Sequence, residues 1–195
     1  MADDGSLRLT VPRGASIAGG LAFASKQARW IERERARQQH RAEAWRDGTL
    51  VWCRGRQERL EVSDAAIVCG PYRIPRPNPT TDVRDVLETY WRGLAERELP
   101  ARCLQLAATD KLSVTRVSIR NQRSRWGACS PRRVITLNWR LVQMPPAVSD
   151  YVLWHELMHL RQPNHSRRFW REVAKVCPDW RECERWLRKH GREIL

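Results

Sequence analysis

Three histidines and one glutamate lie within eleven residues of a chain that contains five histidines in all. They occur in the stretch YVLWHELMHLRQPNHSRRFW, residues 151–170. A helical step of 100° per residue places His159 about 40° from His155, so the two imidazoles lie on one face, one turn apart. Glu156 lies about 100° around the helix axis from His155, so it would stand beside a bound ion rather than among its ligands. The spacing predicts a Zn²⁺ site with Glu156 as general base.

A catalytic zinc site also needs a third protein ligand and one position left for water. His165 is the candidate for this ligand. Pro163 should end the helix near Arg161 or Gln162, and the turn that follows can bring His165 back towards the ion. In the expected mechanism, Glu156 takes a proton from a zinc-bound water and later passes it to the leaving amine.

The alternative interpretation is an ordinary core helix, because the H-E-x-x-H pattern is short and can arise by chance. The opposite side of the helix does carry an apolar face, formed by Leu153, Leu157 and Leu160. Burying His155, Glu156 and His159 together without a partner would, however, be costly. The zinc interpretation is therefore favoured.

The helices around the motif can be placed from their boundary residues. Pro145 and Pro146 are expected to open the motif helix, since proline suits a first helical turn. Ser166 or Asn164 can cap a further helix, which should stop at Pro178. The metal ligands are thus expected at the end of one helix and just before the next.

Two strand candidates precede the motif helix, LSVTRVSIRN over 112–121 and RVITLNWRLV over 133–142. We expect the part of the second strand from Ile135 to Arg140 to form the upper rim of the cleft. There it would pair with an extended substrate, as exposed strand edges do with peptides.

The first part of the chain predicts an extended segment over 7–12 and one long helix over 15–45. After Ile31 this helix is nearly all charge and glutamine, which favours a solvated helix over a nucleic-acid contact. Residues 48–79 contain short β-rich segments separated by Gly, Pro and Asp, and predict a small antiparallel sheet.

A linker, PRPNPTTD, follows over 75–82. Asp82 or Thr81 can cap the next helix, whose apolar stripe should end before Pro100. We therefore expect an N-terminal region over 1–79 and a catalytic region over 80–195, joined in one compact unit of α+β class.

Several stretches closely resemble the YgjP-like metallopeptidases, relatives of the SprT or Spartan type of zinc peptidases. The stretches are RSRWGACS, ITLNWRLVQMPPAVSDYVLWHELMHL, PNHSRRFW, LRLTVPRG and FASKQARWI. The resemblance covers most of the chain, is strongest from about 115 to 175 and is weak between about 35 and 110.

The resemblance implies a zincin-like fold, with a small, twisted, mostly antiparallel sheet and an active-site helix carrying His155, Glu156 and His159. It also implies that His165 is the third ligand. It does not imply a substrate, although the Spartan branch is linked with proteolysis of proteins attached to DNA. Metzincins share the histidine spacing but place Gly where this chain has Gln162, so the chain is not a metzincin by sequence.

The RSRWGACS stretch allows two interpretations. Arg123 and Arg125 can bind substrate carboxylates or phosphates, or the stretch can serve mainly as a tight turn packed through Trp126 and Gly127. Cys129 is not needed as a metal ligand.

Two further residues are candidates for contact with the substrate or the oxyanion. Tyr151 lies one turn before His155 on the metal-facing side of the helix. Asn138 lies in the strand candidate that precedes it. Together with Arg125, they complete the set of expected site residues.

The chain is strongly basic, with a formal net charge of +14 and a pI near 10.7. Such a charge favours binding to polyanions. Two interpretations are open: weak, sequence-independent binding to nucleic acid, and a basic surface that is merely solvated. The expected function is zinc-dependent hydrolysis of protein or peptide substrates. The alternatives are a DNA-linked protein protease and a non-catalytic, zinc-stabilised binding module, for which Cys177 and Cys183 are the only conceivable further donors.

Six cysteines without a C-x-x-C pair indicate reduced, mostly buried thiols. The acidic opening MADDGS lacks the features of a secretory signal, and no stretch approaches 18 consecutive apolar residues. We therefore expect a soluble, cytoplasmic protein without a membrane partner.

Overall fold

The computed structural model describes residues 9–12, 14, 16–32 and 44–194. The chain divides into two compact units, residues 1–44 and residues 45–195. In the first unit, helix α1 (Ile17–Lys26) is capped by Ser16, whose Oγ accepts a hydrogen bond from Gly19 N at 3.0 Å. Residues 28–32 are again helical, whereas residues 9–12, expected to be extended, have no regular secondary structure. The turn at Gln27 interrupts the expected long helix, and residues 44–45 are not helical. The remaining parts of the expected extended segment and long helix, residues 7–8, 15 and 33–43, lie outside the described residues.

The second unit begins with small antiparallel sheets, as expected for residues 48–79. Strands β1 (Leu50–Cys53) and β2 (Arg56–Arg59) form a hairpin. A separate three-stranded sheet follows, made of β3 (Glu61–Val62), β4 (Ala66–Cys69) and β5 (Tyr72–Pro75).

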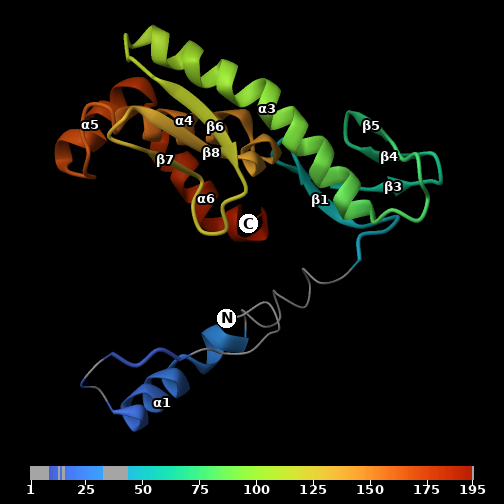
Figure 1. Ribbon diagram of the computed structural model, residues 1–195, viewed down its shortest axis with the longest axis horizontal. Coiled ribbons are helices and arrows are strands. Elements are labelled where there is room, and N and C mark those ends of the chain that lie inside the picture. The colour runs from blue at the N-terminus through green and yellow to red at the C-terminus, as the bar shows by residue number, and fades with distance from the viewer. Residues whose placement is uncertain (1–8, 13, 15, 33–43, 195) are drawn as a thin grey trace. The chain divides into compact units, whose positions relative to one another are not determined.

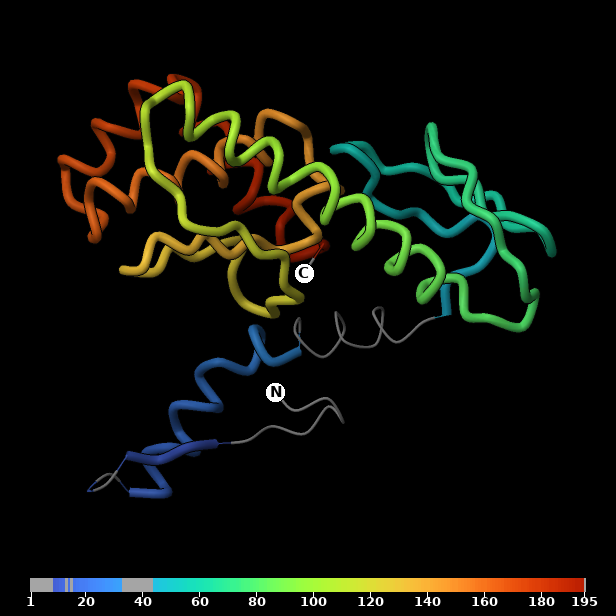
Figure 2. Tube along the Cα trace, turned by 45° about the horizontal axis from the view of Figure 1, so that its top comes forward, coloured from blue at the N-terminus to red at the C-terminus, as the bar shows by residue number. Residues whose placement is uncertain are grey.

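Helix α3 (Val83–Thr109) runs from this region alongside the second three-stranded sheet (Figures 1 and 2). Asp82 caps it, as the sequence allows, but the expected end before Pro100 is wrong, because the helix continues through this proline. A proline inside a helix costs about 3 kcal/mol. The apolar face offsets this cost because it continues beyond the proline, through Cys103, Leu106 and Ala107, all buried.

The sheet beside α3 consists of β6 (Arg116–Arg120), β7 (Gly127–Cys129) and β8 (Val134–Asn138). Its order is β6–β8–β7, with β8 parallel to β6 and antiparallel to β7. Strand β8 is therefore central and both of its edges are paired. The expectation that Ile135–Arg140 pairs with substrate is wrong; among the described strands of this sheet, β6 and β7 are the edges.

The second strand candidate is also shorter than expected. Its strand ends at Asn138, and residues Trp139–Gln143 form the 3₁₀ helix η1, which is buried throughout. Asn138 ends the strand and starts this turn, since its side chain accepts a hydrogen bond from Arg140 N at 3.1 Å.

Three helices complete the unit: α4 (Pro146–Met158), α5 (Arg167–Val176) and α6 (Trp180–Ile194). Helix α4 begins at the expected proline, and Ser166 caps α5 by accepting a hydrogen bond from Phe169 N. Helix α4 ends at Met158, slightly before the expected boundary, and His159 occupies its C-cap in helical conformation.

One hydrophobic core extends through the second unit and includes side chains from all three sheets, α3, η1 and all three later helices. Trp91, Trp139 and Phe169 are its largest fully buried side chains. The mixture of helices with small, mainly antiparallel sheets confirms the α+β class. Within the described part of the chain, every helix is too short or too polar to cross a bilayer.

Candidate metal centre

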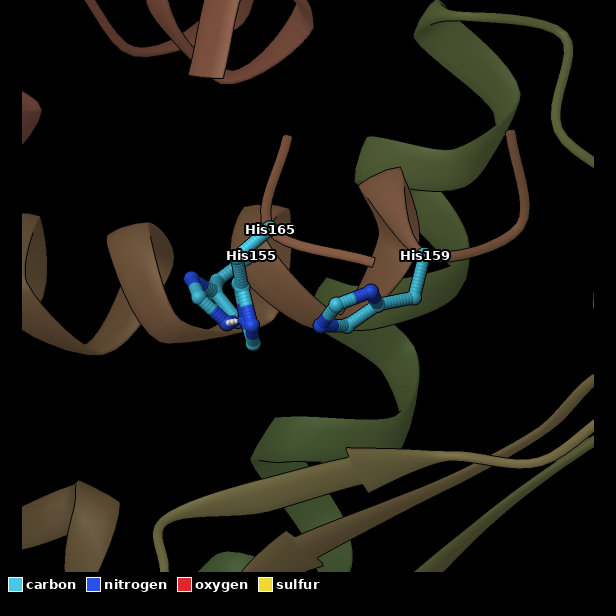
Figure 3. A group of neighbouring side chains, drawn as sticks. All are labelled: His155, His159 and His165. Atoms are coloured by element: carbon cyan, nitrogen blue, oxygen red, sulfur yellow. Dashed lines mark hydrogen bonds between the residues drawn. The ribbon is translucent and has the colours of Figure 1, made fainter. Parts of the chain in front are cut away.

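The three histidines of the motif converge at the end of α4. His155 lies in its last turn, His159 is its C-cap residue, and His165 lies in the turn just before α5. Figure 3 shows the three rings turned towards one another. The Nε2 atoms of His155 and His165 are 2.9 Å apart, and one ligand atom from each histidine lies within 4.8 Å of the others.

This geometry fits a metal ion. Tetrahedral Zn²⁺ with Zn–N bonds of about 2.0–2.1 Å separates its nitrogen ligands by roughly 3.3 Å. The 2.9 Å separation and the 4.8 Å limit for the group lie on either side of this value, so the three histidines are close enough together to share one ion. Neither Cys177 nor Cys183 belongs to the group of candidate ligands that the described residues form.

A backbone carbonyl orients the middle histidine. His159 Nδ1 lies 3.1 Å from the carbonyl oxygen of Gln162, so the Nδ1–H tautomer donates to it and leaves Nε2 free as a metal ligand. Because Gln162 acts through its backbone, its side-chain type gave no indication of this role in the sequence.

An aromatic wall supports the three rings. Phe169 is fully buried, and its ring centroid lies 4.6–4.9 Å from those of His155, His159 and His165. Trp170 stacks on His165 at 6.0 Å and on Trp180 at 4.4 Å. In the sequence, the signal of this contact is their place four and five residues after His165, in the first turn of the next helix.

Burial favours the neutral form of two of these histidines, which is the form that binds metal. Desolvation, with smaller effects from His159 and His165, lowers the pKa of His155 to about 4. Desolvation also lowers the pKa of His159. Two of the three imidazoles are thus poised to bind metal without first losing a proton at neutral pH.

Glu156 lies beside the triad, with its side chain against strand β7. A Cβ added at Gly127 would lie 2.7 Å from Glu156 Oε1, so only glycine leaves room for this carboxyl group. Glu156 is only 7% exposed, and burial raises its pKa to about 7, opposed by the positive charge of Arg125. Near neutral pH this carboxyl group can both accept and release a proton.

The triad and Glu156 open into a cleft of about 920 Å³. One wall is the edge strand β7 with the flanking residues Arg125, Trp126, Ser130, Pro131 and Arg133, and the other is formed mainly by α4 and the turn that follows it. The RSRWGACS signature therefore lies directly opposite the histidines.

The remaining expected site residues lie in different places. Arg125 and Tyr151 line the cleft, and the centroid of the Tyr151 ring is 6.1 Å from that of His155. Cys129 lines it too but is not in the histidine group. Asn138 does not line the cleft: it is fully buried, and its Nδ2 donates to the carbonyl oxygens of Gln122 and Arg125. Its role is to hold the loop before β7.

The packing role that the sequence allowed for the signature stretch is present. Trp126 packs against Gly191 of α6, where an added Cβ would lie 3.1 Å from its ring. Arg125, by contrast, is exposed at the cleft. The turn is thus packed through its tryptophan and presents a charge beside it.

Comparisons with known proteins show the family of the chain. A search of curated proteins found no match. Among solved structures, the crystal structure of the metallopeptidase zymogen of Pyrococcus abyssi abylysin matches with a TM-score of 0.41 and 28% sequence identity, over 46% of this chain and 91% of that chain. The family model described as the YgjP-like metallopeptidase domain matches residues 1–190, nearly the whole chain. The resemblance seen in the sequence is therefore confirmed: the chain belongs to the YgjP-like metallopeptidase family, whose members act on protein or peptide substrates.

Proposed function

We propose that the protein is a zinc-dependent peptidase of zincin type, in which His155, His159 and His165 hold the ion and Glu156 is the general base. The observation that carries the proposal is the convergence of three imidazoles beside a buried carboxyl group in one cleft. When bound, zinc is a Lewis acid that makes water more acidic and polarises a carbonyl oxygen.

Glu156 moves the proton in this reaction. Its carboxylate takes a proton from the attacking water as the C–O bond forms, and returns it to the amide nitrogen as the C–N bond breaks. A base works best when its pKa lies near the working pH, and burial brings the pKa of Glu156 to about 7. The glycine at position 127 fixes where this carboxyl group stands.

Strand β7 binds the substrate backbone. Among the described strands it pairs with β8 alone, along one edge, and its residues line the cleft. An extended peptide can add to the other edge through main-chain hydrogen bonds, independently of the peptide's sequence. This proposal replaces the role that the sequence suggested for β8.

Tyr151 is the candidate donor to the oxyanion. Burial raises its pKa above the ordinary value, so its hydroxyl keeps its proton at neutral pH and remains a hydrogen-bond donor. Its ring stands beside that of His155, on the cleft side of α4.

The proposal is tested by hydrolysis of a quenched-fluorescence peptide mixture with the zinc-loaded protein. Cleavage should disappear with a chelator, return with added zinc, and fall at least a hundredfold in Glu156→Gln. Cleavage that persists in Glu156→Gln at full zinc occupancy would contradict the role of Glu156. Binding of nucleic acid to the basic surface stays a prediction, to be measured with a labelled oligonucleotide at two salt concentrations.

A further inference from the structure

The charges that line the cleft are unevenly distributed. Its exposed charged side chains are those of Arg125 and Arg133, and the carboxylate among its described lining residues is Glu156, which is 7% exposed. A ligand in this cleft therefore meets positive charge at the rim. The net charge of +14 adds to the same field.

The two arginines stand at opposite ends of the edge strand. Arg125 comes two residues before β7 begins at Gly127, and Arg133 lies in the turn that joins β7 to β8. With a rise of about 3.3 Å per residue, a span of four to six residues separates the two ends by roughly 13–20 Å. A peptide laid along β7 would thus pass one guanidinium near each end of the strand.

Within the described part of the protein, neither guanidinium forms an ion pair or a hydrogen bond, although the charge of Arg125 lowers the pKa of the nearby Glu156. The ion pairs formed there by other arginines, such as Arg54 with Glu98 and Arg102 with Asp150, have no counterpart at Arg125 or Arg133. Both side chains are exposed and face the cleft, so their hydrogen-bond donors are available to a ligand.

The backbone at Arg133 supports a functional role. Its φ is +58°, a left-handed conformation that favours glycine or asparagine. Hydrogen bonds fix it there, from Arg133 N to Ser130 O and from Thr115 N to Arg133 O, both 2.9 Å. A long cationic side chain at a position suited to glycine is a local cost of the kind that occurs at binding sites.

We propose that the cleft selects peptide segments bearing acidic side chains, recognised by Arg125 and Arg133 at the two ends of β7. This inference rests on the proposed peptidase function and names its substrate class. A guanidinium can bind a carboxylate through two parallel hydrogen bonds, which gives geometric selectivity as well as attraction. Acidic residues four to six positions apart should match the two ends of the strand.

Nucleic acid is a poorer fit to the same surface. Single-stranded nucleic acid is held by aromatic rings on which bases stack, in addition to positive charge. Apart from the histidines, two aromatic residues among those described line the cleft, Trp126 and Tyr151. Trp126 packs against Gly191, and Tyr151 is 4% exposed. Tyr151 is thus too buried for a base to stack on it, and part of the Trp126 ring is occupied by α6.

The test measures binding in the zinc-loaded Glu156→Gln background, which is expected to bind peptides without cleaving them. The probes are two fluorescein-labelled dodecapeptides of alanine and glutamine, one with two glutamates five positions apart and one with glutamine at those positions. We expect the acidic probe to bind roughly tenfold more tightly by fluorescence anisotropy. Arg133→Glu and Arg133→Gly should remove most of this preference; the glycine variant suits the backbone conformation and guards against misfolding.

Arg132→Glu is the matched control. Arg132 is adjacent and exposed but does not line the cleft, and its variant changes the net charge as much as Arg133→Glu. It should keep the preference. Equal losses in the two charge-reversed variants would show a general effect of net charge and overturn the proposal, as would equal binding of both probes.

Two further readouts separate the possible failures. The first is competition between a single-stranded oligodeoxynucleotide of twelve nucleotides and the unlabelled acidic peptide for displacement of the acidic probe. If the oligonucleotide displaces the probe at the lower concentration, and this displacement depends on Arg133, the proposal is overturned in favour of nucleic acid. Hydrolysis is measured separately with the Glu156-containing protein. Arg133-dependent preference without any hydrolysis would support the recognition and reject the peptidase mechanism, whereas hydrolysis without preference would reject the recognition alone.

Discussion

The backbone of Gly127 lies so close to the side chain of Glu156 that a Cβ at position 127 would stand 2.5 Å from Glu156 Cγ. Side chains do not approach this closely, so the edge strand and the motif helix can pack as they do only with glycine here. The signature stretch thus sets the position of the carboxyl group that we assign as base.

Gly127→Ala should therefore lower peptidase activity without removing the metal. The added methyl group must push the Glu156 carboxyl group away, and misplacement of a catalytic group by about 1 Å can cost roughly a hundredfold in rate. The measurements are kcat/KM on a cleavable peptide and zinc content by mass spectrometry. A variant with unchanged kcat/KM would show that Glu156 adjusts freely and that its position is not critical.

Gly93→Ala is the matched control for this substitution. Gly93 lies inside α3, and an added Cβ would meet only the Nη1 atom of Arg97 at 3.5 Å. Alanine is favoured over glycine inside a helix by up to about 1 kcal/mol. This variant should keep full activity and be as stable as the parent or slightly more so.

Phe169→Leu should weaken zinc binding, because Phe169 contacts all three histidine rings. Residues that position metal ligands typically affect affinity by ten- to a hundredfold, and we expect a loss of roughly tenfold in competition with a chelator. The smaller side chain should also lower the free energy of unfolding by roughly 1–3 kcal/mol.

Val173→Ala separates these two effects. Val173 is fully buried one turn further along α5 and belongs to the same core. Its truncation should cost a similar amount of stability while leaving zinc affinity unchanged. Equal weakening of zinc binding in both variants would mean that general loosening of α5, not the ring of Phe169, is responsible.

Pro100→Ala should stabilise the protein. Alanine restores a backbone hydrogen-bond donor inside α3 and removes a steric clash, which together raise the free energy of unfolding by about 3 kcal/mol. The larger conformational entropy of the unfolded chain lowers it by about 1 kcal/mol. We expect a net gain of about 1–2 kcal/mol and a rise in Tm of roughly 4 °C in thermal unfolding. A lower Tm would show that the proline ring contributes packing that exceeds the helical cost.

The sequence predicted the local elements of the site well, because these depend on short-range patterns. The spacing of His155 and His159, the opening of α4 at Pro146 and the capping of α5 by Ser166 all follow from residues within one or two turns. The convergence of His165 on the other two histidines also depends on a turn of only a few residues.

The features that the sequence missed depend on contacts between distant segments. The strand order could not be read because β8 lies between β6 and β7 although it follows both in the chain. The continuation of α3 past Pro100 depends on burial against the rest of the core, which overrides the local preference. Asn138 was placed among the candidate site residues because nothing local shows that its amide is used to hold a loop.

The central claim is that three histidines hold the metal and Glu156 does not, and zinc content after dialysis tests it most directly. The comparison needs four proteins: the parent, His165→Ala, Glu156→Gln, and His190→Gln as a control in which the substituted histidine lies on α6, outside the triad. We predict near one equivalent of zinc in the parent, Glu156→Gln and His190→Gln, and a large loss in His165→Ala, because two imidazoles alone hold zinc poorly. Full zinc in His165→Ala, or loss of zinc from Glu156→Gln, would contradict the account.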